Sequence, residues 1–360
     1  MRVVQLIDSL EAGGAERMAV TYANSLSKSI EFSGLVATRK EGVLKENLFQ
    51  NVTYLFLNRK KTFDFKALHR LKKYCIQHNV EIIHAHSSSY FIAILLKLIA
   101  PQLKIVWHDH NGVGVENLGI KTYFLKIASL FFLGIISVNT NLKQWAEKKL
   151  YCKNVLYLPN YITPELNFKK ETQLLGISGK RILCLANLRK QKNHEMLLTL
   201  AEKVKQHFPD WTFHCVGKDF KDDYSKSLFE TVAKMQLQDL VFFYDSKEDI
   251  YHIITQSDIG ILTSLSEGLP VSLLEYGLFS KPVVCTSVGQ IPQIIENGKN
   301  GYLAEVNNVD DFFEKIKLLI SNKQLANSLG LQLYQTIEKE YLEDKVLGLY
   351  QNWLLKMIYG

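Results

Sequence analysis

Short apolar runs alternate with longer stretches of helical periodicity along most of the chain. In the first half, strands are predicted at Val3–Ile7, Gly34–Ala37, Thr53–Leu57, Glu81–His84, Lys104–Trp107, Ile135–Val138 and Val155–Leu158. Helical patterns lie between most of them, for example at Ala15–Leu26, Phe65–His78 and Leu142–Leu150. The second half repeats the alternation, with strands predicted at Ile182–Ala186, Thr212–Val216, Leu240–Tyr244, Ile259–Thr263, Val283–Cys285 and Gly301–Ala304. Such alternation is typical of parallel α/β sheets.

A polar stretch with prolines and glycines interrupts the alternation at Pro159–Lys180 and predicts a linker. A chain of 360 residues exceeds what one hydrophobic core usually supports. We predict one domain over residues 1–160, a second over 161–342 and a final helix over 343–360. The pattern indicates two Rossmann-like domains that face each other across a cleft, with ligands at the carboxyl ends of the strands. The helix predicted at Glu343–Ile358 has a broad apolar stripe that needs a surface to cover.

The composition is that of an ordinary soluble globular protein, with 47% hydrophobic and 22% charged residues. Five cysteines are widely spaced and odd in number, and they form no C-x-x-C pair. Reduced thiols in a cytosolic protein are therefore expected. Because Met1 leads directly into the strand-like segment Arg2–Asp8, we expect no signal peptide and a cytoplasmic location.

Positive charge is concentrated in the first half of the chain. Residues 1–160 contain 21 Lys and Arg against 11 Asp and Glu, a net of +10, whereas the remainder has a net of −3. This asymmetry fits an anionic partner, either a membrane surface or a phosphorylated acceptor, and it fits a solvated basic face equally well. The segment Asn58–Lys73 combines seven Lys and Arg with Phe63 and Phe65, as in a helix that lies among lipid headgroups or an ordinary surface helix. Ile120–Val138 is apolar but interrupted, so a helix and a buried strand are expected there rather than a membrane span.

The most informative segment is Ser266–Gly277, with the sequence SEGLPVSLLEYG. Glu267 and Glu275 bracket the predicted start of an apolar helix, at which Gly268 permits close approach of a ligand and Pro270 suits the first helical position. Unpaired N–H groups at such a start attract an anion such as a diphosphate. Two carboxylates about 10–12 Å apart along a helix could then hold groups on either side of that anion. This arrangement fits a nucleotide-sugar, and the alternative is a buried helix with two incidental glutamates.

Gly13 and Gly14 follow the first predicted strand and precede a helix. A glycine pair there allows a ligand to approach the backbone closely, although a plain tight turn would also use one. The segment is not G-x-G-x-x-G, which counts against a nicotinamide-dependent oxidoreductase.

Four histidines lie at the ends of two predicted strands, in EIIHAH (81–86) and WHDHNG (107–112). His84, His86, His108 and His110, with Asp109, could converge on a metal ion. We expect the two members of each H-x-H pair to point to opposite faces of their strand, so that only half of them could meet. The sequence therefore predicts no metal site.

The SEGLPVSLLEYG segment resembles the E-x7-E signature of the retaining glycosyltransferases of family 4, which have the GT-B fold. GGAER at Gly13–Arg17, SVGQ at Ser287–Gln290 and NGKNG at Asn297–Gly301 are similar to further loops of that family, so the resemblance extends over nearly the whole chain. It implies a GT-B architecture in which the C-terminal helix crosses back to the first domain. The chain has no D-x-D triplet, the usual ligand of metal-dependent GT-A glycosyl transfer.

The resemblance implies roles for residues of the second domain. It places Glu275 on the ribose hydroxyls and Glu267 on the donor sugar. Gly268 and Leu269 would hold the diphosphate together with Lys192, whose ammonium offsets the charge that builds up on the departing nucleotide. The resemblance implies three catalytic residues, Glu267, Lys192 and His110.

His110 matches the active-site histidine of the family and would line the donor-sugar pocket, with Gly13 and Gly14 nearby. The chain departs from the family at Asn187, where an arginine is common five residues before the lysine. Arg189 could reach the diphosphate instead. Because side chains differ in how they bind phosphate, this departure bears on donor geometry and rate.

The predicted function is a retaining, metal-independent glycosyltransferase without a cofactor, with a UDP- or GDP-linked sugar as donor. The expected acceptor is a glycan or a polyprenyl-pyrophosphate-linked saccharide of capsule, O-antigen or lipopolysaccharide biosynthesis. We expect no nucleic-acid partner, and an anionic membrane surface is a candidate partner of the basic first domain, which would place the protein on the inner face of the cell membrane. A nucleotide-sugar 2-epimerase on the same fold and a non-catalytic glycan- or lipid-binding subunit of an envelope assembly complex are the alternatives.

Overall fold

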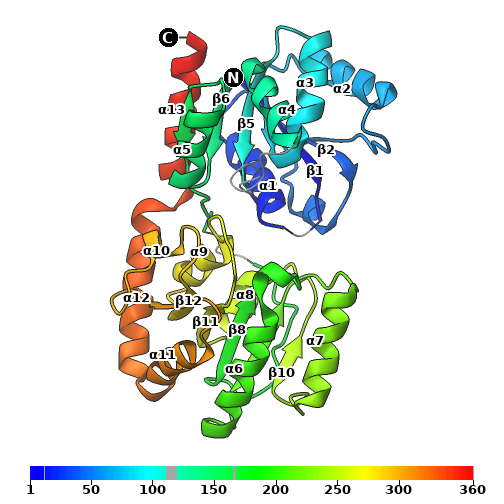
Figure 1. Cartoon of the computed structure of the whole chain (residues 1–360). Coiled ribbons are helices and arrows are strands. Elements are labelled where there is room, and N and C mark those ends of the chain that lie inside the picture. The colour runs from blue at the N-terminus through cyan, green and yellow to red at the C-terminus, as the bar shows by residue number, and fades with distance from the viewer. Residues whose placement is uncertain (12, 111–119, 165–167, 360) are drawn as a thin grey trace. The chain divides into compact units, whose positions relative to one another are not determined.

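The computed structural model describes residues 1–11, 13–110, 120–164 and 168–359. The chain forms two compact units (Figure 1). Unit 1 comprises Met1–Tyr161 together with Glu343–Gly360, and unit 2 comprises Ile162–Leu342. Each unit has its own parallel sheet and its own apolar core.

Within its described residues, unit 1 contains a seven-stranded sheet in the order β3-β2-β1-β4-β5-β6-β7. All neighbouring strands pair in parallel. The strand order reverses between β1 and β4, which is where open α/β sheets commonly bind ligands. The strands are β1 Arg2–Ser9, β2 Phe32–Lys40, β3 Thr53–Phe56, β4 Ile82–His86, β5 Lys104–Asp109, β6 Phe132–Ser137 and β7 Val155–Tyr157.

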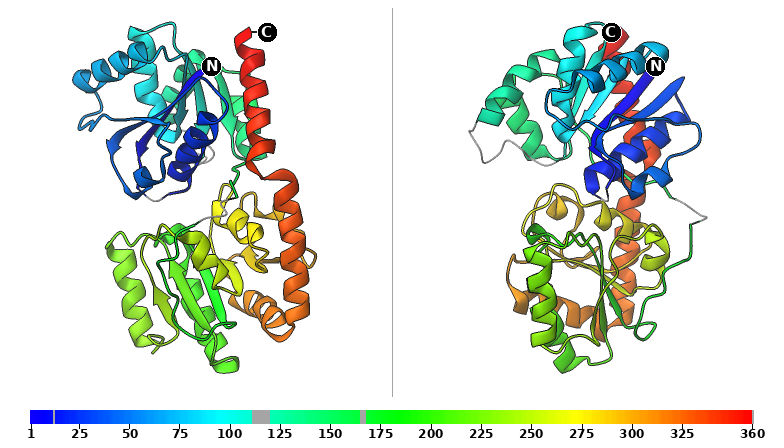
Figure 2. Two further views of the ribbon diagram at one scale, coloured as in Figure 1. Left: turned by 180° about the vertical axis from the view of Figure 1, so that it is seen from behind. Right: turned by 90° about the vertical axis from the view of Figure 1, so that its right-hand side faces the viewer.

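Helices cover both faces of this sheet (Figure 2). They are α1 Gly14–Ser27, η1 Val43–Asn47, α2 Phe65–Gln77, η2 Ser87–Ser89, α3 Tyr90–Ile99, α4 Ile120–Ala128, η3 Ser129–Phe131, α5 Thr140–Lys149 and the C-terminal α13 Glu343–Tyr359. Helix α13, red in Figure 2, packs on unit 1 as the sequence predicts. Gly134 of β6 makes room for it, since a Cβ there would lie 2.5 Å from the Trp353 ring.

In the described part of unit 2, six strands form a sheet in the order β10-β9-β8-β11-β12-β13, with every neighbouring pair parallel. Here the order reverses between β8 and β11. The strands are β8 Arg181–Leu185, β9 Thr212–Val216, β10 Val241–Phe243, β11 Ile259–Leu262, β12 Val283–Thr286 and β13 Tyr302–Ala304.

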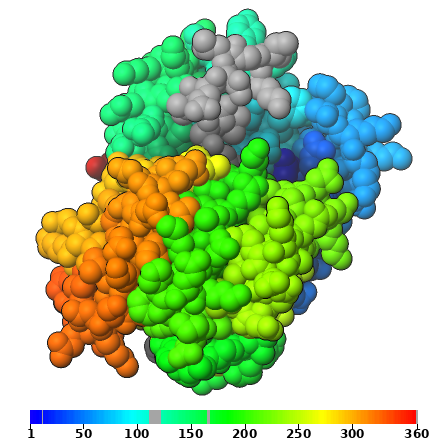
Figure 3. All heavy atoms as spheres, turned by 60° about the horizontal axis from the view of Figure 1, so that its bottom comes forward, coloured from blue at the N-terminus to red at the C-terminus, as the bar shows by residue number. Residues whose placement is uncertain are grey.

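The helices of unit 2 are η4 Lys190–Lys192, α6 His194–His207, α7 Asp223–Lys234, α8 Ile250–Thr255, α9 Val271–Leu278, α10 Ile291–Ile294, α11 Val309–Ser321 and α12 Lys323–Glu340. Side-chain caps start several of them, such as Asn308, whose oxygen accepts from the amide of Asp311 at 3.0 Å. Helices α6 and α11 lie side by side although they are far apart in sequence, as the adjoining green and orange surfaces show (Figure 3).

Both sheets are buried by helices, which explains why their strands are near-continuous runs of Val, Ile and Leu. Every strand that the periodicity predicts is present, and the α/β fold with two Rossmann-like units is confirmed. The ends differ most at β2, which is predicted at Gly34–Ala37 and extends over Phe32–Lys40, whereas β4 continues to His86, which pairs with His108 of β5. All five cysteines are free and buried. Among the described helices, none combines the length and apolarity needed to cross a bilayer.

Candidate functional site

The clearest group of chemistry-bearing residues in unit 2 lies at the reversal of its strand order. The loop after β8 carries Lys192, and the loop after the neighbouring β11 carries Glu267. Lys192 Nζ lies 2.5 Å from Glu267 Oε1, and the Ser264 hydroxyl donates to the same oxygen at 2.6 Å. The Glu267 side chain is only 6% exposed and that of Lys192 22%. Sheet topology thus brings together two predicted site residues that are 75 positions apart.

Hydrogen bonds tie the two loops to each other around this ion pair. The Thr263 hydroxyl donates to the carbonyl of Lys192 at 3.0 Å. The Gln191 side chain donates to the carbonyl of Ser266 at 2.7 Å, and the amide of Leu265 donates to the carbonyl of Gln191 at 2.8 Å. The ammonium and the carboxylate are therefore held by backbone that is itself fixed, and little ordering remains to be done when a ligand binds.

The start of α9 lies next in the chain. Pro270 is the N-cap residue rather than the first helical residue, and the helix begins at Val271 without a side-chain cap. Leu269 is 4% exposed and belongs to the apolar core, so its side chain anchors the loop and only its backbone is suited to a ligand. The backbone N–H of Gln290 donates to the carbonyl of Gly268 at 2.9 Å.

Gly289 allows the loop after β12 to lie against the Glu267 loop. It has φ +57°, and a Cβ there would lie 2.1 Å from the carbonyl oxygen of Glu267. Only glycine fits this close approach without displacing the backbone that carries the carboxylate.

Glu275 lies within α9 and is 1% exposed. The next residue fixes the helix, because the Tyr276 hydroxyl donates to the carbonyl of Leu183 at 3.0 Å and accepts from the amide of Leu185 at 2.8 Å. The sequence suggested that two helical turns separate the two glutamates, and this expectation is wrong. Glu267 precedes the helix, so the expected spacing along a helix axis does not apply.

Asn187 and Arg189 have other partners in the structure. The Asn187 side chain accepts from the amide of Lys218 at 2.8 Å and so holds the turn after β9. The Arg189 guanidinium lies over the Phe220 ring, 4.4 Å from its centroid, and the side chain is exposed. Asn187 thus has a structural contact of its own, and Arg189 is held beside the loop by a cation–π interaction.

In unit 1, the predicted glycine pair lies at the end of β1, beside the strand-order reversal. Gly13 is the N-cap of α1 with extended backbone, and no side chain caps the helix. Around Gly14, the space that a Cβ would occupy has no heavy atom within 4 Å. The Glu16 carboxylate lies against Gly13, because a Cβ there would be 2.2 Å from Glu16 Oε2, so glycine at position 13 makes room for this side chain at the helix start.

The expectation that each H-x-H pair would split between two faces is wrong. Residues i and i+2 of a strand point to the same face. The rings of His84 and His86 in β4 therefore lie together with those of His108 and His110, at the end of the neighbouring β5. His84 Nε2 lies 3.1 Å from His108 Nδ1, and His86 Nδ1 lies 2.9 Å from His110 Nε2. The His84 and His86 rings stack at 4.4 Å and the His108 and His110 rings at 3.9 Å. We call these four residues the histidine quartet. The last two residues of WHDHNG lie outside the described residues.

The histidine quartet is almost completely buried, with exposed fractions between 0% and 8%. Burial lowers the pKa of His110 to about 3 and holds the pKa values of His84, His86 and His108 well below the usual range. Each ring also disfavours a proton on its neighbours. At neutral pH all four imidazoles are therefore uncharged.

Three of these rings, His84, His86 and His108, each place a nitrogen within 4.8 Å of the others, a spacing that could hold a metal ion. However, both nitrogens of His86 are occupied, by His110 and by Gln5 Oε1 at 2.8 Å. Both nitrogens of His84 are occupied as well, since Nδ1 lies 3.0 Å from the Tyr350 hydroxyl. The arrangement is that of a hydrogen-bonded array.

Sequence reasoning missed several residues that build these sites. Ser264, Gln191 and Gly289 in unit 2 position the ion pair, and Gln5 in unit 1 contacts the histidine quartet. A polar residue within an apolar strand, as at Gln5, is the one signal that could have been used, because buried polar side chains need partners.

Comparison with known proteins identifies the fold and the family. The family described as "Glycosyltransferase Family 4" matches residues 12–166, and that described as "Glycosyl transferases group 1" matches residues 168–336. The chain belongs to the group 1 glycosyltransferases, family 4. The predicted membership of family 4 and the predicted glycosyltransferase activity are confirmed, the epimerase alternative is not favoured, and retention of configuration stays a prediction.

Relatives of this glycosyltransferase span nearly its whole length. An uncharacterised glycosyltransferase of Haemophilus influenzae is 23% identical over 322 residues, covering 87% of this chain and 88% of the relative. The UDP-Gal:alpha-D-GlcNAc-diphosphoundecaprenol alpha-1,3-galactosyltransferase of Escherichia coli is 23% identical over 345 residues, covering 89% and 88%. The crystal structure of Anabaena HepE with UDP and glucose has a TM-score of 0.84 over 99% of this chain and all of HepE; at 16% identity this shows a shared fold.

Proposed function

We propose that the protein transfers a sugar from a nucleotide-diphosphate sugar with retention of the anomeric configuration. The observation that carries this proposal is the pairing of Lys192 with Glu267 at the strand-order reversal of unit 2, beside the start of α9. A cation, a carboxylate and helical N–H groups at one sheet edge suit a diphosphate that carries a polyhydroxylated group.

In the proposed mechanism, the diphosphate binds at Gly268, Leu269 and the start of α9. Lys192 turns from Glu267 to the phosphate oxygens, where its charge stabilises the leaving nucleotide. Glu267 is then available to the sugar hydroxyls, and Glu275 binds the ribose. The leaving phosphate accepts the proton of the acceptor hydroxyl on the same face of the sugar, so no protein carboxylate acts as nucleophile.

From unit 1, His110 contributes to the donor-sugar pocket, with Gly13 and Gly14 near the substrates. His110 cannot supply a proton at neutral pH, because burial lowers its pKa to about 3. It serves as a neutral hydrogen-bonding group. The reaction needs no metal, since the charge on the leaving group is met by Lys192 and helical N–H groups.

UDP is the nucleotide we favour over GDP. HepE, which shares the fold, was crystallised with UDP and glucose, and the Escherichia coli relative is named as a UDP-Gal-dependent enzyme. The acceptor we propose is a saccharide linked to polyprenyl pyrophosphate, or a growing envelope glycan. Its support is the name of the same relative, whose acceptor is a diphosphoundecaprenol, and the net charge of +10 over residues 1–160.

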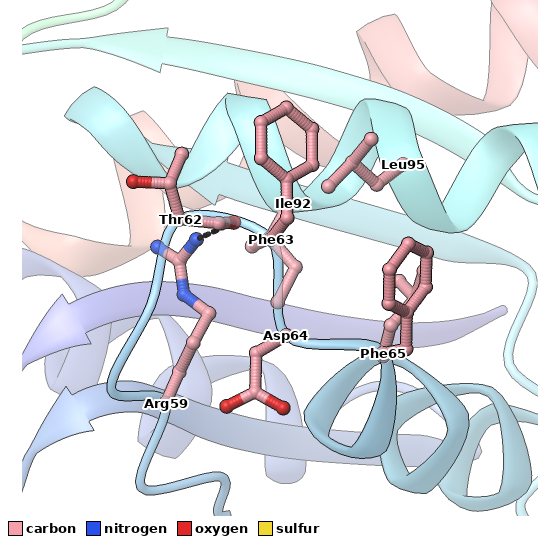
Figure 4. A pocket seen from close by; sticks show the side chains of 8 residues that line it. Arg59, Thr62, Phe63, Asp64, Phe65, Ile92 and Leu95 are labelled. Atoms are coloured by element: carbon pink, nitrogen blue, oxygen red, sulfur yellow. Dashed lines mark hydrogen bonds between the residues drawn. The ribbon is translucent and has the colours of Figure 1, made fainter.

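We propose that unit 1 also contacts an anionic membrane surface on its cytoplasmic side. Phe63 and Phe65 are 62% and 78% exposed at the start of α2, next to a small hollow that they line together with Leu68 and Ile92 (Figure 4). In the segment Asn58–Lys73, Lys60, Lys61, Lys66 and Lys73 are exposed and suited to lipid phosphates. Arg59 takes no part in this, because it is buried and paired with Asp8 at 3.2 Å.

Product analysis tests this proposal. The protein is incubated without metal with UDP-sugars and a polyprenyl-pyrophosphate-linked N-acetylglucosamine, and the product is examined by mass spectrometry and by the anomeric coupling constant. The expected product is the acceptor plus one hexose in the α configuration. A β-linked product would refute retention, altered UDP-sugar without acceptor would indicate the epimerase, and no turnover despite nucleotide binding would favour a non-catalytic subunit.

A further inference from the structure

The histidine quartet carries an inference that rests on the proposed placement of His110 near the donor sugar. Its four rings form two hydrogen-bonded pairs, His84 with His108 and His86 with His110, and one pair stacks on the other. The rings of His86 and His110 lie within 17° of parallel with centroids 5.2 Å apart. Their short N···N contact is therefore an edge-to-edge hydrogen bond, in which one ring donates and the other accepts.

The direction of that hydrogen bond follows from Gln5. Its Oε1, a carbonyl oxygen, can only accept, so the proton between Gln5 and His86 belongs to His86 Nε2. A neutral imidazole has one N–H, which leaves His86 Nδ1 as an acceptor. His110 Nε2 must then be the donor to His86, and His110 Nδ1 carries a lone pair.

The geometry leaves His110 Nδ1 for a ligand. Among the described residues, His110 makes its hydrogen bond through Nε2 alone, while the His108 ring stacked on it fixes its plane. His110 retains 8% exposure, more than its three partners in the quartet. The inner end of the hydrogen-bonded array is Gln5, which is fully buried and whose Nε2 has no hydrogen-bond partner among the described residues.

The surroundings of the quartet keep it neutral. The groups that face it are the rings of Tyr22 and Tyr350 and the amide of Gln5. Within the described residues, no carboxylate hydrogen-bonds to any of the four rings, so nothing there compensates a positive charge. This differs from a catalytic triad, in which an aspartate stabilises the imidazolium.

We propose that Gln5 and His86 are positioning residues that hold His110 as the neutral Nε2–H tautomer, so that its Nδ1 accepts a hydrogen bond from a hydroxyl of the donor sugar. This hydrogen bond would select sugars that carry a hydroxyl group at the carbon facing His110 Nδ1. A sugar with a methyl ether or a deoxy carbon there loses the bond.

The tautomer is tested by long-range ¹H–¹⁵N spectra of protein labelled at histidine, which report which nitrogen of each ring carries the proton. The expected result is Nε2–H for both His86 and His110. Gln5→Leu removes the oxygen acceptor and should give a fraction of His110 as Nδ1–H. An Nδ1–H signal for His110 in the wild type, or tautomers indifferent to Gln5→Leu, would overturn the proposal. So would a stoichiometric metal ion bound to the quartet in the purified protein.

The role of Nδ1 is tested by the calorimetric affinities of UDP and UDP-glucose. His86→Leu leaves His110 without its acceptor and should weaken UDP-glucose binding about 2- to 12-fold, the worth of one neutral hydrogen bond, with UDP binding unchanged. In His86→Asn the amide oxygen can take the place of Nδ1 and should restore the UDP-glucose affinity. Equal losses in the two variants, or a loss of UDP affinity as well, would show a merely structural role. If UDP does not bind the wild type, the proposed function fails while the tautomer measurement still stands.

Discussion

Acid should destabilise unit 1 well before its carboxylates are protonated. The histidine quartet is uncharged in the folded protein, because burial lowers the pKa of every member, that of His110 to about 3. In the unfolded chain each histidine binds a proton near pH 6.5. Below that pH the unfolded state therefore holds more protons, and the free energy of unfolding falls as the pH falls. Above about pH 7.5 both states are neutral and the effect is absent.

The size of the effect follows from the pKa difference. At pH 5 each buried histidine costs about 2 kcal/mol, so the quartet costs about 8 kcal/mol relative to pH 8. A typical domain is stable by about 5–15 kcal/mol, so unit 1 should be close to its unfolding transition at pH 5. Tyr22, Tyr161 and Tyr350 nearby do not offset this, because burial raises their pKa values and they stay protonated throughout.

Tryptophan fluorescence can follow unit 1, which contains Trp107, Trp145 and Trp353. In a Trp211→Phe background, urea unfolding is measured from pH 8 to pH 5, and the slope of the unfolding free energy against pH gives the protons taken up. Below pH 6 we expect a slope approaching four protons from the quartet. The control His69→Asn removes an exposed histidine and should leave the slope unchanged. A free energy that is flat between pH 7 and pH 5 would refute the neutral, buried quartet.

Two further changes probe the ion-pair site of unit 2. Lys192→Met should lower the free energy of unfolding by about 1–3 kcal/mol, because the Glu267 carboxylate is 6% exposed and loses its cation; thermal unfolding measures this, and UDP affinity should fall with it. Unchanged stability and UDP affinity would contradict the pairing. Gly289→Ala should disturb donor binding, since the new Cβ would lie 2.1 Å from the Glu267 carbonyl, whereas Gly298→Ala shares the positive φ but has no heavy atom within 4 Å. Calorimetry with UDP should thus separate the two variants, and equal losses would argue against a role for the close approach.

The sequence predicts the sheet strands well because buried parallel strands are apolar on both faces and stand out between polar helices. It also singles out Glu267 and Lys192 through their resemblance to family 4, and these residues lie in the segments that follow β11 and β8. What it could not supply is which strand ends are neighbours. The pairing of Lys192 with Glu267 depends on β8 lying beside β11, a long-range contact with no local signal.

The histidines show a different limit. Their positions on strand ends are evident, but the face assignment failed, since i and i+2 share a face. Whether such rings bind a metal or each other depends on partners such as Gln5 and Tyr350, which come from distant segments. Periodicity places Gln5 in a strand and Tyr350 in a helix. It gives no indication that the polar ends of these side chains contact the histidine quartet.

In the proposed function, unit 2 binds the nucleotide-diphosphate part of a donor sugar through the Glu267–Glu275 segment. The most direct test is calorimetric binding of UDP, GDP, ADP and CMP, without metal, to the wild type, to Glu275→Gln and to the exposed control Glu195→Gln. We expect the wild type and the control to bind UDP in preference to the other three nucleotides, and Glu275→Gln to lose this binding while remaining folded. Failure of every nucleotide to bind the wild type, or UDP binding that is unaffected in Glu275→Gln, would contradict this proposal.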